Sequence, residues 1–217
     1  PNGLPDEKHY TTANDMAKIA RAAWNNLTFR KFATTEYYEI PPTNKFTETR
    51  YLLNHHKMMK GLDRAYAGVL GGKTGYTQAA GNTLVTYAKG NKTYLVAVVL
   101  QSVNGAYSDT KALLDYGFNN FTRVKVSKNQ NLVSTRQLPS EKNIIKTSDD
   151  SCLFKSDRYR VSVTLPNGAD TSILTTATKI TKNPAGLPLL TTTYSYNGYP
   201  VGTARYVQQQ LLSDMLF

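Results

Sequence analysis

With 217 residues the chain can form one large or two modest domains, and its 26 Lys and Arg against 15 Asp and Glu give a net charge of +11. That charge would suit an anionic partner, but the cations are dispersed without a basic block or a nucleic-acid-binding signature, so we expect no nucleic acid as partner. No apolar run approaches the ~18 residues of a membrane span, and the single Cys152 excludes an intramolecular disulfide.

The N-terminal region predicts a loop followed by two helical segments. Thr12 and Asp15 form a capping pattern, with the hydroxyl at the N-cap and the acid in the first turn. Apolar side chains at helical spacing then predict one buried face made of Met16, Ile19, Ala20, Ala23 and Trp24. A short helical turn is predicted over residues 28–33, and residues 37–40 are predicted to be extended until two prolines end them.

Three strands are predicted over residues 69–77, 82–89 and 93–101, with a tight hairpin at residues 89–92 between the last two. The last strand carries a continuous apolar run, which predicts burial on both faces and hence a central strand with helices against it. A helix should follow from an N-cap at Ser108 to Tyr116, with Leu113 and Leu114 inward and Gly117 as its stop.

The adjacent His55 and His56 raise the question of a metal site. Metal-binding pairs need spacings that place both side chains on the same side of an element, whereas neighbouring side chains diverge. No third Cys, His or acidic ligand is evident nearby. We therefore expect no metal ion here.

The stretch from Gly71 to Thr77 combines one cation and two threonine hydroxyls with three glycines. Glycine lets another backbone come close, lysine supplies a compact charge with three donors, and threonine adds a hydroxyl beside it. On an exposed strand edge this set could pair with an extended peptide and hold its terminal carboxylate. The alternative interpretation is a glycine turn with a solvated lysine, because a bare Lys-Thr-Gly tripeptide recurs by chance.

After Phe121 the pattern changes to short alternating runs over residues 124–126, 159–165, 172–181, 189–196 and 201–207. Turn signals at residues 166–168, 183–184 and 197–198 separate these runs, which predicts a small all-β sandwich or barrel with a boundary near residues 118–124. Residues 208–217 could begin an amphipathic helix. The expected apolar core of this part is Val126, Val161, Val163, Leu165, Ile173, Ile180 and Val201.

Several blocks of sequence occur together in a fixed order. They are Asn2-Gly3-Leu4, His9-x-Thr11-Thr12-Ala13-x-Asp15-Met16-Ala17, Asn54 ahead of Met58-Met59, Gly72-Lys73-Thr74-Gly75-Tyr76-Thr77-x-x-Ala80-Gly81, and Leu113-Leu114-Asp115-Tyr116-Gly117-Phe118. Over residues 1–118 the order and spacing resemble the low-molecular-weight penicillin-binding proteins, the D-alanyl-D-alanine carboxypeptidases of bacterial cell walls. Residues 189–202 resemble the family's C-terminal β domain.

The resemblance implies an active site in which Ser-x-x-Lys, Ser-x-Asn and Lys-Thr-Gly meet, with a serine that forms an acyl-enzyme and is trapped by β-lactams. Lys73 would then be the catalytic cation of this chain, and Thr74 would bond the substrate carboxylate. Gly75 and Tyr76 would present strand backbone to the peptide. The first two motifs are expected upstream of Pro1, on a longer chain, so we expect the 217 residues alone to be inactive.

The sequence also departs from the family pattern. Ser102-Val103-Asn104 and Ser108-Asp109-Thr110-Lys111 have the right residue types, but they follow Lys-Thr-Gly and lie too close together for walls of different subdomains, so we reject both as catalytic. Residues 101–110 lack the arginine that family members often carry there, which leaves Lys73 and Thr74 to bind the carboxylate. His56 stands where a second Asn is expected.

The sequence therefore predicts an α/β part over residues 1–121, an antiparallel sheet with helices as in penicillin-binding proteins and β-lactamases, and an all-β domain over residues 122–217. The resemblance implies an extracytoplasmic serine D-Ala-D-Ala carboxypeptidase of the cell envelope, with membrane association through a C-terminal segment as one option. Its partners would be peptidoglycan pentapeptides, β-lactams and the missing N-terminal segment, without metal or organic cofactor. The alternatives are a serine β-lactamase relative, a non-catalytic wall-binding or scaffold protein, and a basic nucleic-acid-binding module.

Overall fold

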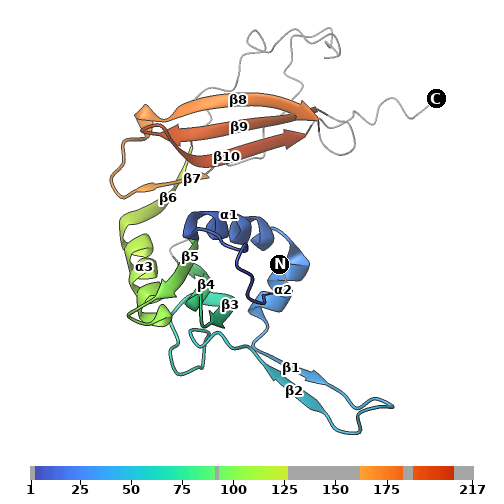
Figure 1. The fold of residues 1–217 in the computed structure, drawn as a ribbon. Coiled ribbons are helices and arrows are strands. Elements are labelled where there is room, and N and C mark those ends of the chain that lie inside the picture. The colour runs from blue at the N-terminus through green and yellow to red at the C-terminus, as the bar shows by residue number, and fades with distance from the viewer. Residues whose placement is uncertain (1–2, 91–92, 127–161, 183–187, 208–217) are drawn as a thin grey trace, which may run out of the picture. The chain divides into compact units, whose positions relative to one another are not determined.

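The computed structural model describes residues 3–90, 93–126, 162–182 and 188–207 and divides the chain into two compact units, Pro1–Asn120 and Phe121–Phe217. The first unit combines helices with antiparallel strands, and the second is built from strands, which confirms the predicted fold class (Figure 1). The elements of the first unit are α1 (Ala13–Trp24), α2 (Leu27–Thr34), β1 (Tyr37–Ile40), β2 (Arg50–Leu53), β3 (Val69–Thr77), β4 (Gly81–Gly90), β5 (Thr93–Ser102) and α3 (Ala106–Asn120).

Helix α1 begins where the capping pattern predicts. The Thr12 hydroxyl accepts a hydrogen bond from the Asp15 amide at 3.1 Å. The helix packs on the sheet through Ala20, whose carbonyl accepts from the Tyr87 hydroxyl at 3.0 Å, and through Trp24, whose ring stacks on Tyr87 at 4.5 Å. The prediction that Ile19 is buried is wrong, because it lies about 100° around the helix from Ala20 and its side chain is 59% exposed.

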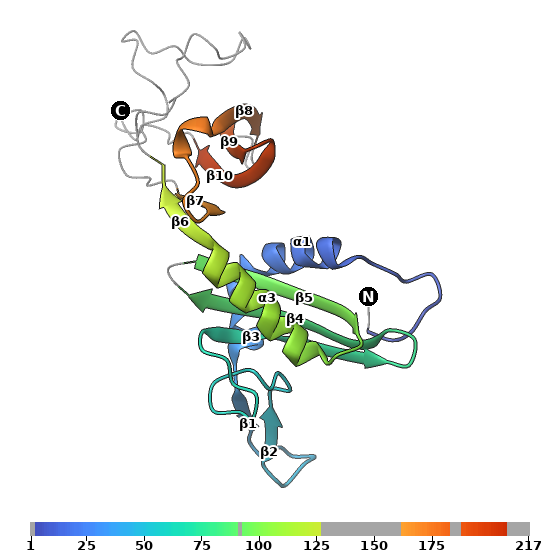
Figure 2. The same ribbon diagram turned by 90° about the vertical axis from the view of Figure 1, so that its left-hand side faces the viewer.

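Strands β3, β4 and β5 form an antiparallel sheet in the order β3-β4-β5, at the positions predicted from the sequence. The prediction that residues 93–101 form a central strand is wrong for the described strands, because β4 lies in the middle and β5 at one edge. The apolar run of β5 is explained by helices on both faces of the sheet, α1 on one and α3 on the other (Figure 2).

The core of the first unit lies between the sheet and α3. It is made of buried residues from the segment before β3, from the three strands and from α3: Met58, Met59, Val69, Leu84, Ala88, Ala97, Val99, Ala106 and Leu114. The prediction that Leu113 also points inward is wrong, because its side chain is 46% exposed.

Helix α3 differs from its prediction at both ends. It begins at Ala106, so Ser108 lies inside the first turn, where its hydroxyl donates to the Asn104 and Gly105 carbonyls at 2.9 and 2.7 Å. It ends at Asn120, so Gly117 is not a stop. A Cβ at Gly117 would lie 2.6 Å from the Leu95 Cδ1 atom, so this glycine permits close packing of the helix on β5.

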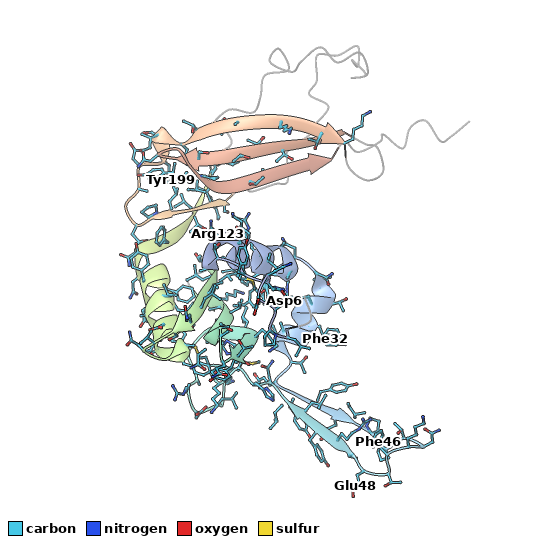
Figure 3. All side chains as sticks on the ribbon, viewed as in Figure 1. Asp6, Phe32, Phe46, Glu48, Arg123 and Tyr199 are labelled. Atoms are coloured by element: carbon cyan, nitrogen blue, oxygen red, sulfur yellow. The ribbon has the colours of Figure 1, made fainter. Side chains whose placement is uncertain are left out.

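Strands β1 and β2 pair as an antiparallel hairpin that extends away from the three-stranded sheet (Figures 1 and 2). Tyr37 and Tyr51 stack on it at 6.1 Å, and the Arg50 guanidinium lies 4.7 Å from the centre of the Phe46 ring. Phe46 and Glu48 occupy the loop at its outer end, and Phe32 lies on α2 (Figure 3).

The second unit contains a two-stranded and a three-stranded antiparallel sheet, the latter in the order β10-β9-β8. Among the predicted core residues, Val163 and Leu165 are buried with Tyr194 and Ala204, and Val126 and Val201 pack against them. Ile173 is 44% exposed in a short 3-10 turn, so its predicted burial is wrong. The strands are β6 (Phe121–Lys125), β7 (Ser162–Pro166), β8 (Thr175–Lys182), β9 (Pro188–Tyr196) and β10 (Tyr199–Val207).

Some predictions for this unit fall outside what the structure describes. They concern Val161, the side chain of Ile180, the turn at residues 183–184 and the helix over residues 208–217. The turn at Asn197-Gly198 is confirmed, because both residues adopt positive φ angles of 49° and 79° between β9 and β10. Within the described residues of the chain, no helix has the length and apolar character needed to cross a membrane.

Candidate active site

The Lys-Thr-Gly stretch lies within strand β3 and not in a glycine turn. Lys73 pairs with Val85 of β4, and Thr74 pairs with Leu84. Because β3 is at the end of the order β3-β4-β5, its other side is a free edge among the described strands. A free edge presents backbone donors and acceptors with which an extended peptide can pair.

The two glycines before Lys73 allow other backbones to approach the strand. A Cβ at Gly71 would lie 2.0 Å from the Ala33 carbonyl oxygen at the end of α2, and a Cβ at Gly72 would lie 2.0 Å from the Val85 carbonyl oxygen. Real Cβ atoms do not approach so closely, so both positions require glycine. Gly71 and Gly72 therefore allow the start of the motif to pack closely between the end of α2 and β4.

The backbone of the motif alternates between β4 and the free edge. The Gly75 carbonyl accepts a hydrogen bond from the Thr83 hydroxyl of β4 at 3.0 Å, so it points toward β4. The Thr74 carbonyl accepts from the Lys73 ammonium. Since successive carbonyls of a strand point in opposite directions, the Thr74 carbonyl faces the free edge.

The four predicted site residues lie on this one strand but differ in direction. Directly opposite residues of an antiparallel pair share a face, so Thr74 projects with Leu84 toward the α3 side and Lys73 with Val85 toward the other. Lys73 is exposed, Thr74 is half-buried and Tyr76 is 71% exposed. Two consecutive residues of β3 therefore supply an exposed ammonium and a hydroxyl beside the free backbone edge.

His56 lies directly under the motif, which the sequence did not indicate. Its side chain is fully buried, and its Nε2 atom lies 2.8 Å from the Thr86 hydroxyl of β4. Burial lowers the pKa of the imidazole below its ordinary value. Asn54 braces the same segment, because its side-chain oxygen accepts from the His56 amide at 3.0 Å and its nitrogen donates to the Thr35 carbonyl at 3.1 Å.

Ser102 and Ser108, which begin the sequences of Ser-x-Asn and Ser-x-x-Lys form, donate hydrogen bonds to nearby groups. The Ser102 hydroxyl donates to the Asp109 carboxylate at 2.6 Å, and the Ser108 hydroxyl donates to backbone carbonyls of its own helix start. The part of the chain that the structure describes contains no cluster of three His, Cys, Asp or Glu side chains that could hold a metal ion.

Part of this chain is similar to known proteins. The family model described as D-alanyl-D-alanine carboxypeptidase matches residues 1–104, a range that contains β3 and the segment under it. Residues 1–104, slightly less than half of the chain, are therefore similar to this family. The D-alanyl-D-alanine carboxypeptidase of Streptomyces sp. strain K15 is 32% identical over 119 residues, which cover 54% of this chain and 40% of that protein.

Other relatives extend the comparison. The D-alanyl-D-alanine carboxypeptidase DacF of Bacillus subtilis is 28% identical over 151 residues, or 67% of this chain and 37% of its own length. The chain thus spans only part of the curated relatives that it matches. A solved structure of a peptidoglycan synthesis regulatory factor (PBP3) from Streptococcus pneumoniae covers 97% of this chain and 59% of its own at a TM-score of 0.65 and 16% identity, which shows a shared fold.

Proposed function

We propose that this chain supplies the Lys-Thr-Gly wall of a serine D-Ala-D-Ala carboxypeptidase that acts on peptidoglycan stem peptides and is acylated by penicillin. The observation that carries the proposal is the free edge of β3, with Lys73 and Thr74 on it, inside the residues that match the family. The matching proteins bear the same activity in their names. The cell envelope, where peptidoglycan lies, is the proposed location.

In the proposed reaction, the backbone edge of β3, the Thr74 hydroxyl and the Lys73 ammonium have separate roles. The stem peptide pairs with the free edge through the Thr74 carbonyl and its neighbours, and this places the peptide in register. The Thr74 hydroxyl donates to the terminal carboxylate, and the Lys73 ammonium leaves the Thr74 carbonyl to offset the carboxylate charge. The hydroxyl of a serine on another segment attacks the D-Ala-D-Ala carbonyl, the terminal D-Ala leaves with a proton, and water then resolves the ester.

The test is hydrolysis by a protein that joins this chain to a segment with a Ser-x-x-Lys nucleophile. Release of D-Ala from a D-Ala-D-Ala peptide is measured for the wild type, Lys73→Ala and Lys89→Ala. Lys89 is a matched control, because it is an exposed lysine on the neighbouring strand β4. We expect Lys73→Ala to lose at least about 10²-fold in kcat/KM, whereas a loss within about threefold contradicts the assignment of Lys73.

The same preparation separates the alternative functions. A serine β-lactamase relative would turn over penicillin rapidly without releasing D-Ala from the peptide. A non-catalytic wall-binding protein would neither release D-Ala nor retain a covalent penicillin label. Either result would contradict the proposal.

A further inference from the structure

The buried His56 is a polar group that the proposed reaction does not use. Its side chain has no exposed surface, and its Nδ1 atom lacks a hydrogen-bond partner among the residues that the structure describes. Burying a polar atom without a hydrogen-bond partner is unfavourable. The contacts of His56 should therefore explain why a polar side chain is buried at this position.

The imidazole of His56 spans the two strands that carry the site. On β4 its Nε2 atom meets the Thr86 hydroxyl at 2.8 Å, and Thr86 pairs directly with Gly72 of β3. On β3 a Cβ at Gly72 would lie 2.8 Å from the His56 Cδ2 atom, so the ring lies directly against the glycine backbone. The residue that follows Gly72 is Lys73. The ring therefore supports the strand at the start of the Lys-Thr-Gly motif.

Among the residues that the structure describes, no carboxylate is a hydrogen-bond or ion-pair partner of the ring. Tyr107 of α3 packs edge-on against it at 6.2 Å, and the Tyr107 hydroxyl contacts the backbone of the neighbouring His55 and Lys57. The Arg64 guanidinium lies 5.3 Å from the Tyr107 ring centre, and the ammonium of the adjacent Lys57 lies 3.8 Å from the Asp63 carboxylate. Met58, Met59 and Leu84 complete the core on this side of the sheet.

We propose that His56 is a positioning residue for the Lys-Thr-Gly strand. Its neutral imidazole holds β3 in the position in which Lys73 and Thr74 contact the substrate. The proposal rests on the proposed function for its effect on the reaction, whereas the effect on the strand is independent of it. Protonation would place an uncompensated positive charge under Gly72 and loosen the start of the motif.

The direction of the pH effect follows from the burial. The pKa of His56 in the folded chain lies below its ordinary value of 6.5, so the folded state favours the neutral ring. The stabilisation is complete above pH 6.5 and is lost as the pH falls from there through the lowered pKa of the folded state. The β3 strand should therefore loosen on acidification.

The experiment compares His56→Phe with the matched control His55→Gln, because His55 is exposed and next in sequence. Amide hydrogen-exchange protection factors, which correct for the intrinsic pH dependence of exchange, are measured from pH 5 to 8 at Lys73 and Gly75, whose amides face β4. The rate of acylation by a fluorescent penicillin is measured over the same range. Phenylalanine fills the site without a titrating nitrogen. We expect the variant to be acylated at least about tenfold more slowly at pH 8, since small displacements at a site cost that much, and its acid dependence to flatten.

The wild type and His55→Gln should both show lower protection factors in β3 below pH 6.5. If His56→Phe keeps the pH dependence of the wild type in exchange and in acylation, the proposal is wrong. Should His56→Phe fail to fold, Thr86→Val removes the hydroxyl partner at constant shape. Faster exchange in β3 but not in α3 then supports a positioning role, and uniform acceleration across the first unit contradicts it. A wild type that exchanges as expected but is never acylated contradicts the proposed function alone.

Discussion

Replacing Gly75 by alanine tests whether the third residue of the motif is glycine for a reason of packing. A Cβ at this position would lie 2.4 Å from the Thr83 Oγ1 atom. The same hydroxyl donates to the Gly75 carbonyl at 3.0 Å. In Gly75→Ala the threonine must therefore rotate away, and the hydrogen bond between β4 and β3 is lost.

The cost can be assembled from two terms. A typical intramolecular hydrogen bond contributes about 0.5–1.5 kcal/mol to stability, and a side chain forced off its preferred rotamer costs about 0.5–1.5 kcal/mol, so we expect a total of roughly 1–3 kcal/mol. Thr83→Ala removes the hydroxyl and the clash together. In that background the same Gly75→Ala change should cost little, so the two substitutions should be strongly non-additive.

Urea unfolding followed by tryptophan fluorescence measures this cost in the first unit alone. The sequence has a single tryptophan, Trp24 of α1, and its ring stacks on Tyr87 of β4. Gly72→Ala is the matched comparison, because its Cβ would lie 2.0 Å from the backbone oxygen of Val85, which no side-chain truncation relieves. An unchanged midpoint for Gly75→Ala, or a penalty that persists in the Thr83→Ala background, would refute the reasoning.

Three further predictions concern the site and its support. In a protein with the nucleophile, Thr74→Val should raise KM more than it lowers kcat, because the hydroxyl binds the ground-state carboxylate; steady-state kinetics showing only a fall in kcat would contradict this role. The 217-residue chain alone should take up no covalent label from a fluorescent penicillin, since the Ser102 and Ser108 hydroxyls are engaged by Asp109 and by backbone carbonyls, and an adduct on either serine in peptide mass mapping would overturn that conclusion. Burial and the Asp115 carboxylate raise the pKa of Tyr66 to about 12 from an ordinary 10.0, so its contribution to stability is present below pH 10 and is lost as the pH rises toward 12. Tyr66→Phe should then lose less stability than the wild type between pH 9 and 11 in urea unfolding, and equal losses would contradict the assignment.

Local patterns in the sequence predicted much of the first unit because they report local physics. The Thr12 and Asp15 cap, the hairpin between β4 and β5 and the strand over the Lys-Thr-Gly motif each depend on neighbouring residues. The order of the strands could not be predicted in the same way. An apolar run reports that both faces of β5 are covered, but whether a strand lies at an edge depends on pairing with distant segments.

The residues that sequence reasoning missed are those whose role depends on contacts across the sheet. His56 was considered as a metal ligand and as a departure from the family pattern at a position where a second Asn is expected. Its position against Gly72 and Thr86 could not be predicted, because it depends on how β3 and β4 pair. The one available signal was the pair of glycines before Lys73, which indicated that something approaches the strand closely. Gly117 shows the opposite case, since a glycine near a helix end predicts a stop and here accommodates Leu95.

The most direct test of the central claim is a crystal structure of the penicillin-acylated protein, with this chain joined to a segment that carries a Ser-x-x-Lys nucleophile. We expect the ligand to lie along the free edge of β3, with its carboxylate within about 3 Å of the Thr74 hydroxyl and near the Lys73 ammonium. A ligand bound covalently at a serine elsewhere, with the edge of β3 unoccupied, would contradict the account.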